Sequence, residues 1–419
     1  MANSFSIKAF FIIQGMFLLV MSSSFGAEPM RLSLEQALQI ALERNLEFKA
    51  KREELGIADG RILRANLFLQ HNPELDGDVA NRRLKKPEEG FNKNLPQGGV
   101  ALMQEFEIGG QPLYRRQAAR QNLEKVKFEI GDFERSLRFR VTEIFLKLLN
   151  AESKIKQGER IVELRSRLHE ASKTRLSLGD IPEVQVILSE FELNRARSEL
   201  IGLQREREEL LARLQTELAL EEDTRIDIQG ELGRTSPSFS LQDLLKTALD
   251  RRPDLAASER EKRLSEAEEL LTRAERIPNI KVGAFYEKDD KDNIVGGKIS
   301  IPLPFFDRKQ GELREALARK SIANLNYLNR RQALEREIRA AYNKFRLAER
   351  DIALYPEDSL NRFDENLDLN QRAYQEGQID LSDAILFQNQ VIEARQKFID
   401  ALTNYNLAVA ELKFQAGVE

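Results

Sequence analysis

The sequence lacks several residue types on which enzymes and metal sites commonly depend. Of its 419 residues none is cysteine or tryptophan, and only two are histidine. Without cysteine the chain can form no disulfide framework, iron–sulfur cluster, thiolate zinc site or lipid-anchored N-terminal cysteine. His71 and His169 lie too far apart in the sequence to form a histidine zinc site or a catalytic triad by themselves. We therefore expect no catalytic residue, no cofactor and no bound metal, and we expect that the chain is not an enzyme.

Glycine, proline and an excess of one charge are also scarce. The chain has 22 glycines and 12 prolines, and its 65 basic residues nearly balance 69 acidic ones. With 32% charged and 41% hydrophobic residues, this composition is typical of long solvated helices rather than of a thick globular core. The near balance of charge, without a long basic block, argues against nucleic acid as a partner.

The N-terminus has the pattern of a secretory signal. An apolar run over residues 9–21 follows a lysine and precedes three serines, and it is too short to span a bilayer as a permanent helix. We expect a signal peptide at 1–26, because Ser24 and Gly26 are small residues at the −3 and −1 positions. Cleavage after Ala27 is the second option. Beyond this segment no apolar window is long enough for a transmembrane helix.

The chain contains an internal repeat. The sequence S-L-E-Q-A-L beginning at Ser33 returns as S-L-Q-D-L-L beginning at Ser240, an offset of 207 positions. Both serines resemble helix N-caps, since an acceptor follows each of them three residues later. Further along, Gly179 and Gly377 occupy equivalent turns at an offset of 198. The predicted repeats, each with a helix, two strands and a long helical hairpin, are residues 27–235 and 236–419.

Short segments in each repeat alternate apolar and polar residues with a period of two, which predicts strands. The clearest alternation places on one face Ile280, Val282, Ala284 and Tyr286. Proline or glycine bounds each segment. The predicted strands are residues 73–83, 98–108, 278–288 and 293–304. Periodicity alone favours two ordinary hairpins that cover a soluble core.

The helices are too long for one globular domain. Residues 111–178 contain no interior proline or turn cluster, so they predict a helix about 100 Å long. The equivalent stretch, 309–376, contains Pro356, which should kink it. We expect helical hairpins at 111–220 and 307–416.

The return helices of both hairpins share one heptad phase, with small residues at alternate seam positions that allow close antiparallel packing. Ile392 and Ile399 add a second apolar edge, which favours a wall of helices in contact on both sides. A plain coiled-coil hairpin with scattered surface isoleucines is the alternative.

Four strands cannot close a barrel by themselves. Open strand edges cannot face lipid, because unpaired backbone groups cost several kcal/mol each there. If these strands span a membrane, two copies of the chain would supply eight strands and three copies twelve. The sequence pattern does not determine whether two or three copies assemble. The predicted fold is mainly α, with a small membrane β-barrel continued by helices.

With these features the sequence resembles the TolC-type outer-membrane efflux protein family. The resemblance rests on the repeat, on the caps at Ser33 and Ser240, and on the segments N-P-E-L from Asn72 and R-P-D-L from Arg252. The segment Y-Q-E-G from Tyr374, followed by Asp383, is similar to the second tip turn of that family. The segment E-I-G-G-Q, which contains Gly109 and Gly110 between strand and helix, resembles the CzcC-like heavy-metal branch.

The resemblance implies a homotrimer in the bacterial outer membrane, in contact with lipid, with a twelve-stranded β-barrel and a twelve-helix α-barrel in the periplasm. It further implies a periplasmic adaptor protein and an inner-membrane RND-type pump driven by protons as partners. The chain would be a passive exit duct for heavy-metal cations. Multidrug efflux and type I secretion by the same fold are alternatives, and a soluble periplasmic coiled-coil adaptor or scaffold is an alternative of another class.

The turns between the long helices are the candidate aperture. In a trimer their acidic residues would form rings that attract cations. By resemblance, Asp383 and Tyr374 match positions that line or lock the closed aperture. The acids also suit helix starts, as caps and first-turn residues; we favour capping for Asp180 and Asp380 and leave Asp383 open. The aperture candidates are Asp180, Glu183, Tyr374, Asp380 and Asp383, and the tip-turn glycines are Gly179 and Gly377.

Overall fold

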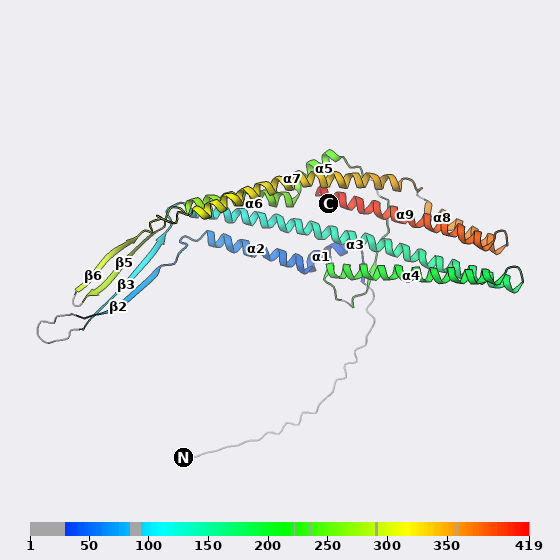
Figure 1. Ribbon diagram of the computed structural model, residues 1–419, viewed down its shortest axis with the longest axis horizontal. Helices are drawn as coiled ribbons and strands as arrows, with labels where there is room; N and C mark the ends of the chain where they lie inside the picture. The colour runs from blue at the N-terminus through cyan, green and yellow to red at the C-terminus, as the bar shows by residue number, and fades with distance from the viewer. Residues whose placement is uncertain are drawn as a thin grey trace, which may run out of the picture.

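The computed structural model describes residues 30–83, 94–221, 223–234, 237–289, 292–356 and 358–418. The predicted signal peptide, residues 1–26, lies outside them. The molecule is elongated, with a four-stranded sheet at one end and long helices that run away from it to two turns at the other end (Figure 1). In chain order the elements are β1 (Met30–Leu32), α1 (Leu34–Arg44), α2 (Leu46–Ala65), β2 (Glu74–Arg83), β3 (Asn94–Phe106), α3 (Gln111–Ser177), α4 (Glu183–Leu218), β4 (Ile226–Ile228), α5 (Leu241–Arg251), α6 (Pro253–Ala274), β5 (Ile280–Asp289), β6 (Asp292–Ser300), α7 (Gln310–Ile352), α8 (Ser359–Gln375) and α9 (Leu381–Ala416).

The four predicted strands form one antiparallel sheet in the order β2-β3-β5-β6. β3 begins at Asn94 rather than at 98, and β6 ends at Ser300 rather than at 304. Pro302 and Pro304 explain the earlier end of β6, because proline has no N–H to donate to a strand ladder. β1 and β4 form a separate two-stranded parallel pair that the sequence analysis missed.

Each repeat begins with two helices, where the sequence analysis predicted one. Asn45 ends α1 and caps α2: its Oδ1 accepts a hydrogen bond from the N–H of Phe48 at 2.9 Å, and its Nδ2 donates to the Glu217 carbonyl at 2.9 Å. Arg252 lies between α5 and α6 and donates to the Gln415 carbonyl at 3.1 Å. The repeat offsets relate Asn45 to Arg252 and Glu217 to Gln415. Both corners are therefore tied to the end of a return helix in the same way.

The two proline-containing segments that carry the family resemblance lie in different places. The segment from Asn72 leads into β2, whereas the segment from Arg252 forms the corner between α5 and α6. The first-repeat equivalent of the latter is the segment from Asn45, in which leucine replaces the proline. The capping prediction for Ser33 is confirmed, since it forms a capping box with Gln36.

The long helix of the first repeat is continuous, but its counterpart in the second repeat is broken. α3 runs from Gln111 to Ser177, whereas α7 ends at Ile352 and α8 begins at Ser359. The predicted kink at Pro356 is therefore a full break. Arg234, from the linker between the repeats, donates to the Ile352 carbonyl, and the Ser359 hydroxyl donates to the Pro356 carbonyl at 2.6 Å. These bonds satisfy carbonyl groups that a broken helix would leave exposed.

Each repeat has its own apolar core near the middle of the molecule. In the first, α3 contributes Phe145 to a cluster that includes Leu214 of α4. In the second, Phe345 of α7 packs with Tyr405 and Leu412 of α9. The C-terminal parts of the predicted heptad seams lie in these cores, with Leu210 and Leu214 in the first and Phe398, Ala401, Ala408 and Leu412 in the second. Arg207 of α4 is a charged residue at one seam position, and it pairs with Glu152 of α3 at 3.6 Å.

A partly buried charge network links the second corner to α7. The Arg252 guanidinium donates to Asp254 at 2.6 Å, and Arg330 donates to the same carboxylate at 2.6 Å. Glu337 joins both arginines at distances of 2.8 to 3.2 Å. Burial alone would raise the pKa of Asp254, but the hydrogen bonds and charges of Arg252 and Arg330 lower it to about 2.

We expect Asp254→Asn to lower the free energy of unfolding at pH 7 by about 2 kcal/mol. Because the pKa of Asp254 in the folded chain lies below its ordinary value of 3.8, its charged form stabilises the fold above pH 4. This contribution is lost as the pH falls toward 2, so wild type and variant should converge there. Denaturant unfolding followed by circular dichroism at a series of pH values measures the effect. Glu393→Gln, which removes an exposed ion pair with Lys397, is the matched control, and equal stability of Asp254→Asn and wild type at pH 7 would contradict the prediction.

Candidate functional site

Most of the exposed apolar residues of the sheet lie on one face. The register pairs Leu75 with Leu102, Leu102 with Ala284, and Ala284 with Gly297, and directly paired residues share a face. On this face Val79 is 92% exposed and Val295 is 76% exposed. The other exposed apolar residues of the face are Leu75, Val100, Leu102, Phe106, Val282, Tyr286 and Ile299. An apolar face of this extent marks contact with lipid or with another protein.

The opposite face of the sheet is mainly polar. Asp76, Asp78 and Glu287 lie on it by the same alternation. Near the helical end, the Lys281 ammonium pairs with the Glu74 carboxylate at 2.8 Å, and Asn279 donates to Glu105 at 2.7 Å. The sheet is therefore amphipathic, with one face suited to an apolar medium and the other to water.

The sheet is open at both edges. Among the described residues, β2 pairs only with β3, and β6 pairs only with β5. Each edge strand therefore presents a row of backbone N–H and C=O groups on its outer side. Such edges are templates for pairing with another chain.

The predicted strand-to-helix junction is a compact turn. Gly110 has a φ of +82°, which favours glycine, and a Cβ on Gly109 would lie 2.5 Å from the Ala274 carbonyl oxygen. The buried Gln111 side chain accepts from the Gly109 N–H at 2.8 Å and donates to Asn279 at 3.1 Å. The sequence analysis did not single out Gln111. A signal existed, because Gln310 opens α7 and accepts equivalently from the Arg308 N–H at 2.7 Å.

Gly179 lies in the turn between α3 and α4, and Gly377 lies in the turn between α8 and α9. Figure 1 shows both turns at the end of the molecule opposite the sheet. Gly179 has a φ of +81° and Gly377 a φ of +73°. After each glycine the next N–H bonds back into the helix: Asp180 donates to the Arg175 carbonyl and Gln378 to the Ala373 carbonyl, both at 2.9 Å. This bonding is the Schellman arrangement, which ends a helix with a left-handed residue. Both tips are therefore built by equivalent residues.

The acidic residues of the tips have different roles. Asp380 caps α9, since its Oδ1 accepts from the Asp383 N–H at 2.8 Å, so the capping prediction is confirmed for Asp380. It is wrong for Asp180, because Pro182 holds the N-cap position of α4 and no side chain caps that helix. Glu183 lies in the first turn of α4, and the Asp383 side chain is exposed beside a groove between α8 and α9.

Tyr374 is fully buried between the two hairpins. Its hydroxyl lies 2.8 Å from the Ser172 hydroxyl on α3, and the Arg175 guanidinium lies 5.2 Å from the centre of its ring. It packs in a small apolar cluster with Leu168 and Leu381. Tyr374 therefore joins the hairpins inside one chain, whereas Asp383 faces outward.

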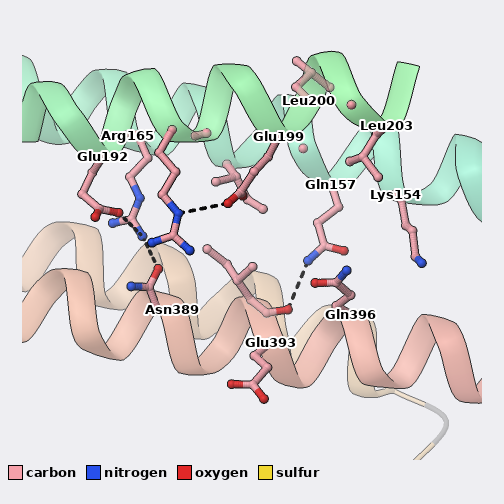
Figure 2. Close-up of a pocket in the computed structure, with 16 residues that line it drawn as sticks. Lys154, Gln157, Arg165, Glu192, Glu199, Leu200, Leu203, Asn389, Glu393 and Gln396 are labelled. Carbon is pink, nitrogen blue, oxygen red and sulfur yellow. Dashed lines mark hydrogen bonds and ion pairs between the residues drawn. The ribbon is translucent and has the colours of Figure 1, made fainter. Parts of the chain in front are cut away.

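A polar layer that the sequence analysis missed continues this contact toward the middle of the helices. The buried Arg165 guanidinium donates to the side-chain oxygens of Gln388 at 2.8 Å and Asn389 at 2.6 Å, with Glu192 at 3.9 Å. Figure 2 shows Arg165 reaching from α3 toward Asn389 of α9 beside a cavity of about 590 Å³. Burial lowers the pKa of Arg165, and the Glu192 charge opposes this shift. No pattern in the sequence marks Arg165, because it resembles the many exposed arginines of these helices.

Neither a metal cluster nor a membrane-spanning helix occurs in the part of the chain that the structure describes. No group of three or more histidine, cysteine, aspartate or glutamate side chains is arranged to hold a metal ion there. Within the same residues, no helix combines the length and the apolar character needed to cross a bilayer.

Comparison with known proteins gives concordant results. Residues 244–418 match the model of the outer membrane efflux protein family. The chain is 25% identical over 382 residues to the cobalt-zinc-cadmium resistance protein CzcC of Cupriavidus metallidurans, and the match covers 88% of this chain and 86% of that protein.

The fold is similar to those of solved membrane proteins. A membrane protein from Pseudomonas aeruginosa superposes with a TM-score of 0.76 at 19% identity, and the outer-membrane channel OprN with a TM-score of 0.77 at 17% identity. Each comparison covers 92% of this chain and 90% of the other. Residues 244–418 therefore resemble the outer membrane efflux protein family, and the chain as a whole has the fold of outer-membrane channels, which lie in the outer membrane and extend into the periplasm.

Proposed function

We propose that the chain is the passive exit duct of a tripartite efflux system, and that three copies form the channel. The observation that carries this proposal is the amphipathic sheet with two open edges. Four strands from each of three copies would give the twelve strands that the family resemblance implies, with β6 of one copy beside β2 of the next. The polar face would then line the channel and the apolar face would contact lipid.

The proposed substrates are heavy-metal cations. The similarity to a cobalt-zinc-cadmium resistance protein supports this class, as does the E-I-G-G-Q segment with Gly109 and Gly110 at the junction between β3 and α3. A conduit needs no metal ligands of its own, because selectivity can reside in the pump that loads it. The proposed partners are therefore a periplasmic adaptor and an inner-membrane RND-type pump.

The tips would form the periplasmic aperture. Asp180, Glu183 and Asp383 are exposed at or beside the two tip turns, so three copies would place carboxylates around one axis. The buried contact between Tyr374 and Ser172 would hold the hairpins of each copy together. We also propose that residues 27–235 and 236–419 are two structural repeats, and that both contribute to the wall of the channel.

A soluble periplasmic adaptor or scaffold is the competing function. The apolar face of the sheet disfavours it, because that face would be exposed to water in a soluble monomer. We expect the mature protein to be extracted from membranes only with detergent and to form conducting channels in planar bilayers. A stable monomer in plain buffer would contradict the proposed function.

Deletion of the gene should lower tolerance to at least one of zinc, cobalt, cadmium, copper and silver, because the duct is the last step of export. Growth across a concentration series of each ion measures the effect, and the wild-type gene supplied in trans is the control. If tolerance to all five ions is unchanged and sensitivity to drugs increases, the proposed substrates are drugs and not metal cations.

Asp383→Ala should raise single-channel conductance, because Asp383 lies at the proposed aperture and alanine removes both its volume and its charge. Conductance in planar bilayers is the measurement. Glu393→Ala, on the same helix but farther from the tip, is the matched control. If Asp383→Ala conducts like the wild type, Asp383 has no role beyond the first turn of α9.

A further inference from the structure

Glycines recur on the mainly polar face of the sheet, which would line the proposed channel and is named the inner face. Each of these glycines is the direct partner of a larger residue on the neighbouring strand, and directly paired residues share a face. The pairs are Asp78 with Gly99, Met103 with Gly283, and Phe285 with Gly296. Along the strands the pairs follow one another in steps of two residues, so they occupy three successive levels of the inner face.

In each pair the larger side chain lies across the glycine. A Cβ built on Gly296 would lie 2.7 Å from two ring carbons of Phe285, and a Cβ on Gly283 would collide with the Met103 sulfur. At Gly99 the nearest atom to such a Cβ is a carboxylate oxygen of Asp78, at 3.1 Å. The space above these glycines is therefore occupied by the side chains of their partners.

Glycines on the opposite, apolar face of the sheet are not covered in this way. Among the described residues, the nearest atom to a Cβ built on Gly77 or on Gly297 is a backbone oxygen at 3.9 Å. Gly296 and Gly297 are neighbours in β6, yet a side chain covers only the first of them. The covering therefore belongs to the inner face.

The covered glycines allow large side chains to lie flat. Side chains on a strand normally stand roughly perpendicular to the sheet. Met103 is only 4% exposed and Phe285 is half-buried, because each of them leans on the neighbouring strand instead. Contact of an aromatic ring with a cross-strand glycine is a known way to stabilise that glycine in a sheet. The inner face is therefore flatter at these levels than its residue types alone would make it.

The size of the proposed barrel makes the height of these side chains important. A barrel of about eight strands is just filled by its own side chains, whereas one of about sixteen leaves an aqueous channel. Twelve strands lie between these two cases, so the inner side chains determine how much of the interior stays open. In a trimer each of these side chains would occur three times around the axis.

We propose that Gly99, Gly283 and Gly296 set the inner width of the barrel by keeping the inner side chains flat against the wall. This inference rests on the proposed function, because it names the residues that limit the size of a solute within the membrane. Phe285 is the largest of the covering side chains, so Gly296 has the greatest effect. A larger residue at position 296 would push the ring off β6 and into the channel.

The inner width can be measured with thiol reagents of graded size, because the sequence contains no cysteine. Ser300 is exposed on the inner face at the helical end of β6, so a reagent from the cell exterior must pass all three levels to reach it. Intact cells with Ser300→Cys would be treated with maleimide-polyethylene glycols of increasing mass. In Ser300→Cys/Gly296→Val, labelling by the largest reagents that label Ser300→Cys should be lost, whereas a small maleimide should still react.

Two further variants serve as controls. Ser300→Cys/Gly297→Val should keep the size limit of Ser300→Cys, because the new side chain lies on the apolar face. Addition of Phe285→Ala to Ser300→Cys/Gly296→Val should restore labelling by the large reagents, because it removes the displaced ring. A structural defect caused by the valine itself would not be repaired in this way.

Fluorescence measures the position of the ring independently of transport, because the sequence contains no tryptophan. Phe285→Trp in detergent should be only weakly quenched by acrylamide. Adding Gly296→Ala or Gly296→Val should shift the emission to longer wavelength and increase the quenching, whereas adding Gly297→Val should change neither. Equal quenching of all these variants would overturn the inference.

The outcomes separate this inference from the proposed function. If Gly296→Val admits the same largest reagent as its parent, or if Phe285→Ala does not restore labelling, the inference is overturned and the duct remains. If the small maleimide labels Ser300→Cys in detergent but not from outside intact cells, the inner face does not line a channel, and both proposals are overturned.

Discussion

The unpaired edges of a four-stranded sheet impose the constraint on which the rest of the structure depends. β2 and β6 each carry backbone groups that, in the described chain, find no partner on their outer side, and in lipid each such group costs several kcal/mol. Side chains cannot provide hydrogen-bond partners for all the backbone groups along a whole edge strand. Only another strand can, and in the proposed channel that strand comes from a neighbouring copy. The helices near the tips also have two free sides. They follow the order α4-α3-α9-α8, so this layer ends at α4 and α8, as the sheet ends at β2 and β6.

At the strand-to-helix junctions and at the helix corners, the two repeats make equivalent hydrogen bonds. Gln111 and Gln310 both accept a hydrogen bond from the N–H two residues earlier, one after Gly110 and the other after Lys309, which has a φ of +57°. At the helix corners an asparagine amide and an arginine guanidinium donate to equivalent carbonyls of the return helices. The backbone bond is what both repeats retain. The side chain that makes it can change, provided that it reaches the same carbonyl group.

The features that the sequence predicted are those determined locally. Alternation with a period of two located the strands, the absence of breakers located α3, and Gly179 and Gly377 located the tips. Two of the errors concern contacts between distant segments. The break after Ile352 depends on Arg234 from the linker between the repeats, and the corner at Asn45 depends on the end of α4. At the tip, glycine spacing gave the turns, but no pattern showed that Tyr374 is buried and that Asp383 is exposed.

The differences between the repeats concentrate at the tips, and this has a mechanical consequence. Identical repeats would make every contact between neighbouring hairpins equally strong. In this chain the contact within a copy has the bonds of Ser172 with Tyr374 and of Arg165 with Asn389, which are directional and lose their strength when helices shift by an ångström or two. These bonds therefore hold the two hairpins of one copy in a fixed position relative to each other at their tips.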